Sequence, residues 1–110
     1  MNSHWNRALV AIAFAILAPL SVAQVITVTP SGSVTGGETV TVGFSDPSRA
    51  GQTITIYVSN GEPPPFDEEI EIKIELDVDG NGSAKWVADG GWEQAIFSGG
   101  EAARVTVQIN

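Results

Sequence analysis

Residues 70–82 read IEIKIELDVDGNG, and across the first nine of them branched aliphatic side chains alternate with charged ones. An alternation with a period of two places each kind of side chain on its own face of a β-strand, so this segment predicts a strand with one buried and one solvated face. A single strand cannot bury five aliphatic side chains, so a second layer must cover them. We expect residues 70–78 to form the central strand of the fold.

The rest of the chain after residue 23 consists of short alternating segments separated by glycines and other turn residues, without a helical period. This pattern predicts an all-β protein, and seven strands suit two antiparallel sheets packed as a sandwich. Among the inward positions we expect Trp86 to be the centre of the core, because large side chains are few. The predicted strands are 25–29, 39–45, 53–59, 70–78, 83–88, 94–98 and 103–109.

Residues 1–23 have the features of a secretory signal peptide, with one arginine before an apolar segment at 8–20 and small residues before Gln24. The apolar segment has 13 residues, whereas a membrane-spanning helix needs about 20. We therefore expect cleavage before Gln24 and an exported, soluble product, periplasmic, extracellular or at the cell surface. The alternative is an uncleaved membrane anchor. Residues 24–110 are long enough for one small domain.

The composition excludes several classes of function. All 13 acidic residues but only four of the five basic ones lie after residue 23, so the expected product has a formal charge of −9. Nucleic acids and anionic membranes are therefore unfavourable partners. The chain has no cysteine, and its only histidine, His4, would leave with the signal peptide. We expect a monomer without disulfides or cofactor, and not an enzyme, because so short a chain also has little room for a catalytic cleft.

Four segments of the chain share a pattern with known domains, and these are ITVTP at 26–30, GETVTV at 37–42, DGNGSA at 79–84 and RVTVQI at 104–109. With them the chain resembles the bacterial immunoglobulin-like domains of exported and cell-surface proteins, and the resemblance covers nearly all of residues 24–110. The chain has neither the paired cysteines nor the third-strand tryptophan of antibody domains, and Tyr57 occupies that strand. The resemblance implies an immunoglobulin-like β-sandwich with a structural or adhesive role.

Residues 77–82 form the pattern D-x-D-x-N-G, the first half of a calcium-binding loop. Asp77, Asp79 and Asn81 would supply oxygen ligands, and we expect them to bind calcium weakly. The second half of the loop is missing, because its twelfth position is Ala88, which has no carboxylate. The alternative interpretation is a hairpin turn with polar side chains.

Two aromatic residues in predicted loops are candidate contacts for a partner. Phe66 follows three prolines, which favour an extended polyproline II segment that is ordered before any partner arrives. The alternative is that Phe66 folds back as a lid on the core. Trp92, in a predicted turn, could stack on a sugar ring, or could instead cap the end of the sandwich.

These features predict a function class but no specific ligand. The absence of a converging polar cluster, together with the acidic strand and proline loop, favours a structural or protein-interaction module whose partner is another exported or surface protein. The alternative is a small-ligand module that binds carbohydrate or calcium.

Overall fold

A computed structural model describes residues 23–110, so the predicted signal peptide lies almost wholly outside the described residues. The described part of the chain contains a short 3-10 helix, η2 (Pro47–Arg49), and eight strands. All seven predicted segments form strands, with shifted ends in three of them. The strands are β1 (Val25–Thr29), β2 (Ser33–Val34), β3 (Thr39–Ser45), β4 (Thr53–Ser59), β5 (Glu69–Glu75), β6 (Asn81–Val87), β7 (Gln94–Ser98) and β8 (Val105–Ile109).

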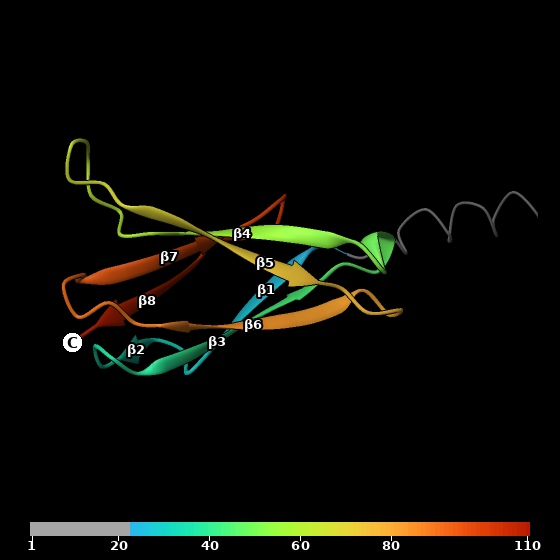
Figure 1. The fold of residues 1–110 in the computed structure, drawn as a ribbon, viewed down its shortest axis with the longest axis horizontal. Helices are drawn as coiled ribbons and strands as arrows, with labels where there is room; N and C mark the ends of the chain where they lie inside the picture. The colour runs from blue at the N-terminus through green and yellow to red at the C-terminus, as the bar shows by residue number, and fades with distance from the viewer. Residues whose placement is uncertain (1–22) are drawn as a thin grey trace, which may run out of the picture.

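The strands form two sheets that face each other, which confirms the predicted all-β sandwich (Figure 1). One sheet has the order β1-β3-β6 and the other has the order β2-β8-β7-β4-β5. All pairs are antiparallel except one, because the two-residue strand β2 runs parallel to β8. The sequence analysis missed β2, which is too short to have a recognisable period.

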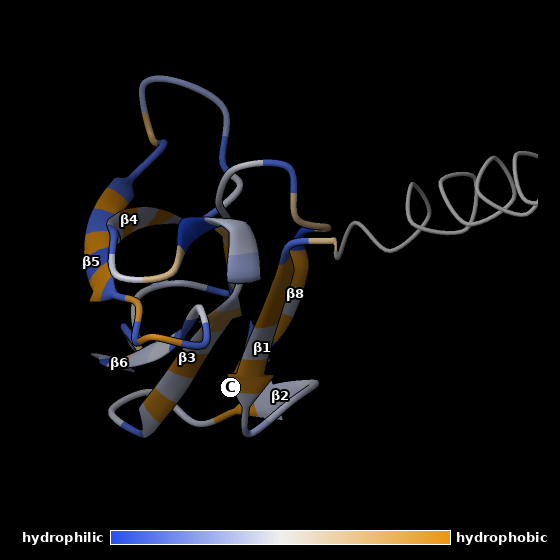
Figure 2. Ribbon diagram, turned by 90° about the vertical axis from the view of Figure 1, so that its right-hand side faces the viewer, coloured by the Kyte–Doolittle hydropathy of each residue, from blue (hydrophilic) through white to orange (hydrophobic). Residues whose placement is uncertain are grey.

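The segment predicted to be the central strand lies at an edge. In the five-stranded sheet β5 pairs with β4 on one side only. Alternation of aliphatic and charged side chains reports which face of a strand is buried, and it carries no information about the number of neighbouring strands. The prediction of a central position was therefore wrong, although the alternation itself is clear along β5 in Figure 2.

Burial along β5 and the residues after it is graded. Ile74 and Leu76 are buried, Ile72 is partly buried, and Ile70 is 39% exposed. Val78, predicted to face inward, is 88% exposed because the strand ends at Glu75 and the chain turns at Asp77. Near residue 70, β5 diverges from β6 and leaves the cover of the opposite sheet (Figure 1). The expected burial of all five aliphatic side chains is thus correct only for Ile74 and Leu76, in the middle of the segment.

Three aromatic side chains occupy the core between the sheets. Trp86 lies with its ring 5.6 Å from that of Trp92 and 5.7 Å from that of Phe97, centroid to centroid. The contact with Phe97 is edge to face, at an interplanar angle of 85°, which is a favoured geometry for aromatic pairs. Phe97 is fully buried and the two tryptophans nearly so. The expected central role of Trp86 is confirmed.

One end of the sandwich is closed by a junction between the β3–β4 and β5–β6 connections. The backbone N–H of Asp46 donates to the carbonyl oxygen of Gly80 at 2.8 Å. The helix η2 begins directly after Asp46 and lies at this end of the molecule (Figure 1). The loop at residues 60–68 and the C-terminus lie at the opposite end (Figure 1). None of the helices in residues 23–110 has the length and apolar character needed to cross a membrane.

Candidate functional site

The loop between β4 and β5 is organised by one buried amide side chain. Asn60 is only 7% exposed. Its Oδ1 accepts hydrogen bonds from the backbone N–H groups of Glu62 and Glu68, and its Nδ2 donates to the carbonyl oxygen of Phe66. The backbone N–H of Asn60 also donates to the carbonyl oxygen of Glu68, which closes the base of the loop. Four hydrogen bonds from one residue thus hold residues 60–68 in a defined shape.

Phe66 projects from this loop into solvent and is 74% exposed. Its backbone N–H donates to the carbonyl oxygen of Pro63 at 3.0 Å, so the proline segment forms a turn. The expected extended polyproline II conformation is therefore wrong, and so is the interpretation of Phe66 as a lid on the core. The side chain of Asn60 holds the loop in this folded shape, because it bonds to the backbone at residues 62, 66 and 68. The structure presents a large apolar side chain on an ordered backbone.

Trp92 lies in the core, as the interpretation of a residue that caps the sandwich end predicts. It is 7% exposed, packs on Trp86, and donates from its Nε1 to Oε2 of Glu68 at 3.1 Å. A buried indole usually finds such a partner for its N–H group. In this arrangement the ring has no face free for a sugar, and its role is to fix the end of the 60–68 loop to the core.

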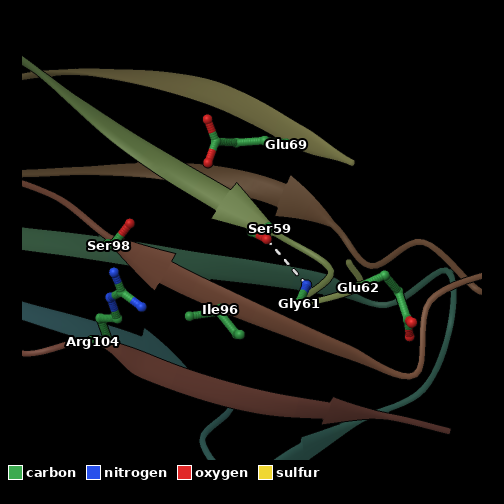
Figure 3. Close-up of a pocket in the computed structure, with 7 residues that line it drawn as sticks. All are labelled: Ser59, Gly61, Glu62, Glu69, Ile96, Ser98 and Arg104. Carbon is green, nitrogen blue, oxygen red and sulfur yellow. Dashed lines mark hydrogen bonds between the residues drawn. The ribbon is translucent and has the colours of Figure 1, made fainter. Parts of the chain in front are cut away.

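A hollow of about 370 Å³ opens beside this loop on the outer face of the five-stranded sheet (Figure 3). Arg104 points into it from one side, and the carboxylates of Glu62 and Glu69 lie toward the other sides (Figure 3). No hydrogen bond or ion pair links the guanidinium of Arg104 to another described residue. The hollow therefore combines separated charges of both signs. Its lining residues are Ser59, Gly61, Glu62, Glu69, Ile96, Ser98 and Arg104.

The segment with the calcium-loop pattern forms the turn between β5 and β6. Oδ1 of Asp77 accepts hydrogen bonds from the backbone N–H groups of Asp79, at 2.9 Å, and Asn81, at 3.0 Å. Hydrogen bonds from Asn81 and Asp79 lower the pKa of the Asp77 carboxyl. Among residues 23–110, no three acidic or histidine side chains group closely enough to hold a metal ion. Calcium binding by Asp77, Asp79 and Asn81 stays a prediction.

Asp46 is the most deeply buried ionisable group of the described chain, at 2% exposure. Its Oδ1 accepts hydrogen bonds from the hydroxyl of Ser48 at 2.6 Å and from the backbone N–H of the same residue at 3.0 Å. Its Oδ2 accepts one from Nε2 of Gln24 at 2.8 Å, and Nε of Arg49 lies 3.6 Å away. The Ser48 hydroxyl, aided by Gln24 and Arg49, lowers the pKa of Asp46 despite the opposing effect of burial.

We predict that Asp46 makes the protein less stable in acid. Because its pKa is lower in the folded state, its contribution is complete above the unfolded value of about 4 and is lost as the pH falls through the folded value. Asp46→Asn should lower the free energy of unfolding at pH 7, and the deficit relative to wild type should shrink at pH 2.5. Urea titrations at both pH values measure this, with exposed Asp67→Asn as the control. An equal deficit at the two pH values would contradict the assignment.

Comparisons of the chain with protein-family models, with curated proteins and with solved structures found no match. Any function of the 60–68 loop and the hollow beside it is therefore argued from their geometry alone. Sequence reasoning proposed Phe66 but missed Asn60 and Arg104, because an isolated polar residue in a loop or at a strand end has no periodic signal. Nothing in the sequence Asn60-Gly61 indicates that the asparagine becomes the centre of the loop.

Proposed function

We propose that the chain is an exported, immunoglobulin-like β-sandwich domain that serves, without catalysis, as a structural or protein-interaction module at the cell surface or in the periplasm. The two-sheet sandwich and the signal-peptide pattern support this proposal. The absence of cysteine fits a domain whose stability comes from packing, here the Trp86, Trp92 and Phe97 cluster. The partner is another exported or surface protein.

The exposure of Phe66 is the observation that carries the proposal. Aromatic side chains, phenylalanine among them, are enriched at protein interfaces relative to the rest of the protein surface. Binding is stronger when the contact residue does not have to be ordered on association, because that ordering costs free energy. Asn60 already orders the backbone on both sides of Phe66 through its bonds to residues 62, 66 and 68. The 60–68 loop is therefore a preorganised contact surface.

We predict that Phe66→Ala abolishes most partner binding without loss of stability. Truncation of a central interface aromatic costs about 2 kcal/mol or more, which is roughly a thirtyfold loss of affinity. The immobilised protein is incubated with envelope and secreted fractions of the source cells, and captured proteins are quantified by mass spectrometry. Val78→Ala is the matched control, because Val78 is 88% exposed in the turn at the opposite end of the sandwich. Equal capture by Phe66→Ala and wild type would refute the proposal.

The alternative class, a small-ligand module, is favoured by one observation, which is the hollow beside the loop. Arg104 offers an unpaired guanidinium there, Ile96 an apolar surface, and Ser59 and Ser98 their hydroxyls. Such a set suits a polar ligand with a carboxylate, such as an acidic sugar. Binding on a glycan array that Arg104→Gln removes would assign this function in place of protein docking.

A further inference from the structure

The free edge of β5 exposes a run of unpaired backbone groups. Strand β4 pairs with β5 from Thr53 opposite Glu75 to Ser59 opposite Glu69. Hydrogen bonds just beyond each end of this pairing continue the same register. Leu76 N–H donates to Gln52 O, and Asn60 N–H donates to Glu68 O. Hydrogen-bonded and non-hydrogen-bonded pairs alternate along an antiparallel ladder. Even-numbered residues of β5 therefore bond to β4, and the N–H and C=O groups of Glu69, Glu71 and Lys73 point away from it.

This edge is closed at one end and open at the other. At the closed end, Gly82 of β6 lies so near the carbonyl oxygen of Glu75 that a Cβ at position 82 would collide with it. Toward residue 69 the strand diverges from β6 (Figure 1), and Ile70 is left 39% exposed although it points toward the interior side of its sheet. The described chain provides no further strand for this edge. An added strand would pair with the backbone and cover Ile70.

We propose, on the basis of the protein-interaction function above, that this edge binds an extended segment of the partner as an additional β-strand, and that the segment alternates basic and apolar residues. Strand addition to an open sheet edge gains affinity from backbone hydrogen bonds and specificity from alternate side chains. Three of the four outward side chains on β5 are glutamates, at 69, 71 and 75, so basic residues opposite them are favoured. The apolar residues face Ile70.

The net charge of the protein favours a basic segment over a second copy of the chain at this edge. Residues 24–110 carry a formal charge of −9, so two copies repel each other, while a basic segment is attracted. Pairing of β5 with its own copy about residue 71 would also place Glu71 opposite Glu71, which is unfavourable. Phe66 lies three residues before β5, so one partner can contact the loop and the edge together.

The test uses a synthetic peptide with alternating lysine and valine as the probe, and a peptide with glutamate in place of lysine as its control. Glu71→Gln removes the charge and keeps the backbone N–H, whereas Glu71→Pro removes both. Proline is tolerated at an edge position whose N–H faces solvent, so Glu71→Pro should fold, which circular dichroism checks. Binding is measured by fluorescence anisotropy at 50 and 300 mM salt, to separate general screening from pairing.

We expect the lysine peptide to bind at least tenfold more tightly than the glutamate peptide at both salt concentrations. Glu71→Pro should bind it at least tenfold more weakly than Glu71→Gln does, and the amides of Glu69 and Lys73 should gain protection from hydrogen exchange in the complex. Equal binding by the proline and glutamine variants would overturn the proposal. Wild-type self-association that Glu71→Pro abolishes would instead assign the edge to a second copy.

The capture experiment with Phe66→Ala separates this proposal from the function on which it rests. Loss of partner capture in Phe66→Ala, with capture unchanged in Glu71→Pro, would retain the protein-interaction function and reject strand addition. Unchanged capture in both variants would reject both.

Discussion

Trp86→Ala should lower the free energy of unfolding by about 3 to 5 kcal/mol, the range for truncation of a large aromatic side chain in a core. Trp86 contacts both other members of the aromatic cluster, with ring centroids 5.6 and 5.7 Å away. Its loss removes these contacts and leaves a cavity that Trp92 and Phe97 cannot fill. Small domains have a total stability of about 5 to 15 kcal/mol, so the variant should be close to unfolding.

The measurement is a urea titration with a thermal melt, in which the midpoint should fall by roughly 15 °C or more. Val87→Ala is the matched control, because Val87 is the next residue of β6 and is 58% exposed on the opposite face. Its cost should stay within about 0.5 kcal/mol, as is usual for surface positions. If Trp86→Ala lowers the free energy of unfolding by less than about 1 kcal/mol, the aromatic cluster does not dominate the stability of the core.

Gly80→Ala should have the second large effect, about 2 to 5 kcal/mol, from two physical causes that add. Gly80 has φ of 82°, where an alanine costs about 1 to 2 kcal/mol because its Cβ approaches the carbonyl oxygen. In addition, a Cβ at this position would lie 2.6 Å from Cα of Pro47 and would collide with the backbone of Asp46. Crowding of this kind typically costs about 1 to 3 kcal/mol. The junction that closes this end of the sandwich would have to shift.

Gly37→Ala separates the two causes. Gly37 has φ of 88°, but a Cβ there would meet no atom within 4 Å, so only the cost of the backbone conformation applies. Urea titrations of both variants should give a larger loss for Gly80→Ala by at least about 1 kcal/mol. Equal losses of unfolding free energy in the two variants would mean that the β3–β4 and β5–β6 connections are not closely packed in solution.

The sequence predicted a loop around Phe66, but it did not predict which side chains of the 60–68 loop and of the hollow beside it are exposed or buried. Three prolines and the aromatic residue after them made residues 63–66 a candidate contact segment. Whether Phe66 is exposed or covers the core depends on Asn60, whose side chain holds the backbone of Phe66. For Trp92 the sequence favoured a position that caps the end of the core over one that stacks on a sugar, and the structure places it in the core, in contact with Trp86. Arg104 faces the hollow only because β7 and β8 place it beside Ser98.

The sequence by itself determined the class of fold and the sides of its strands, because both follow from a period of two and from turn residues, which are local properties. The tertiary structure decided which strands are neighbours, where the core ends and which loop residues are exposed. These depend on contacts between residues far apart in the chain, such as Gln24 with Asp46 and Trp92 with Glu68. The alternating segment at residues 70–78 shows both sides of this division. Its pattern fixed the inward face of β5, and pairing with β4 alone made it an edge.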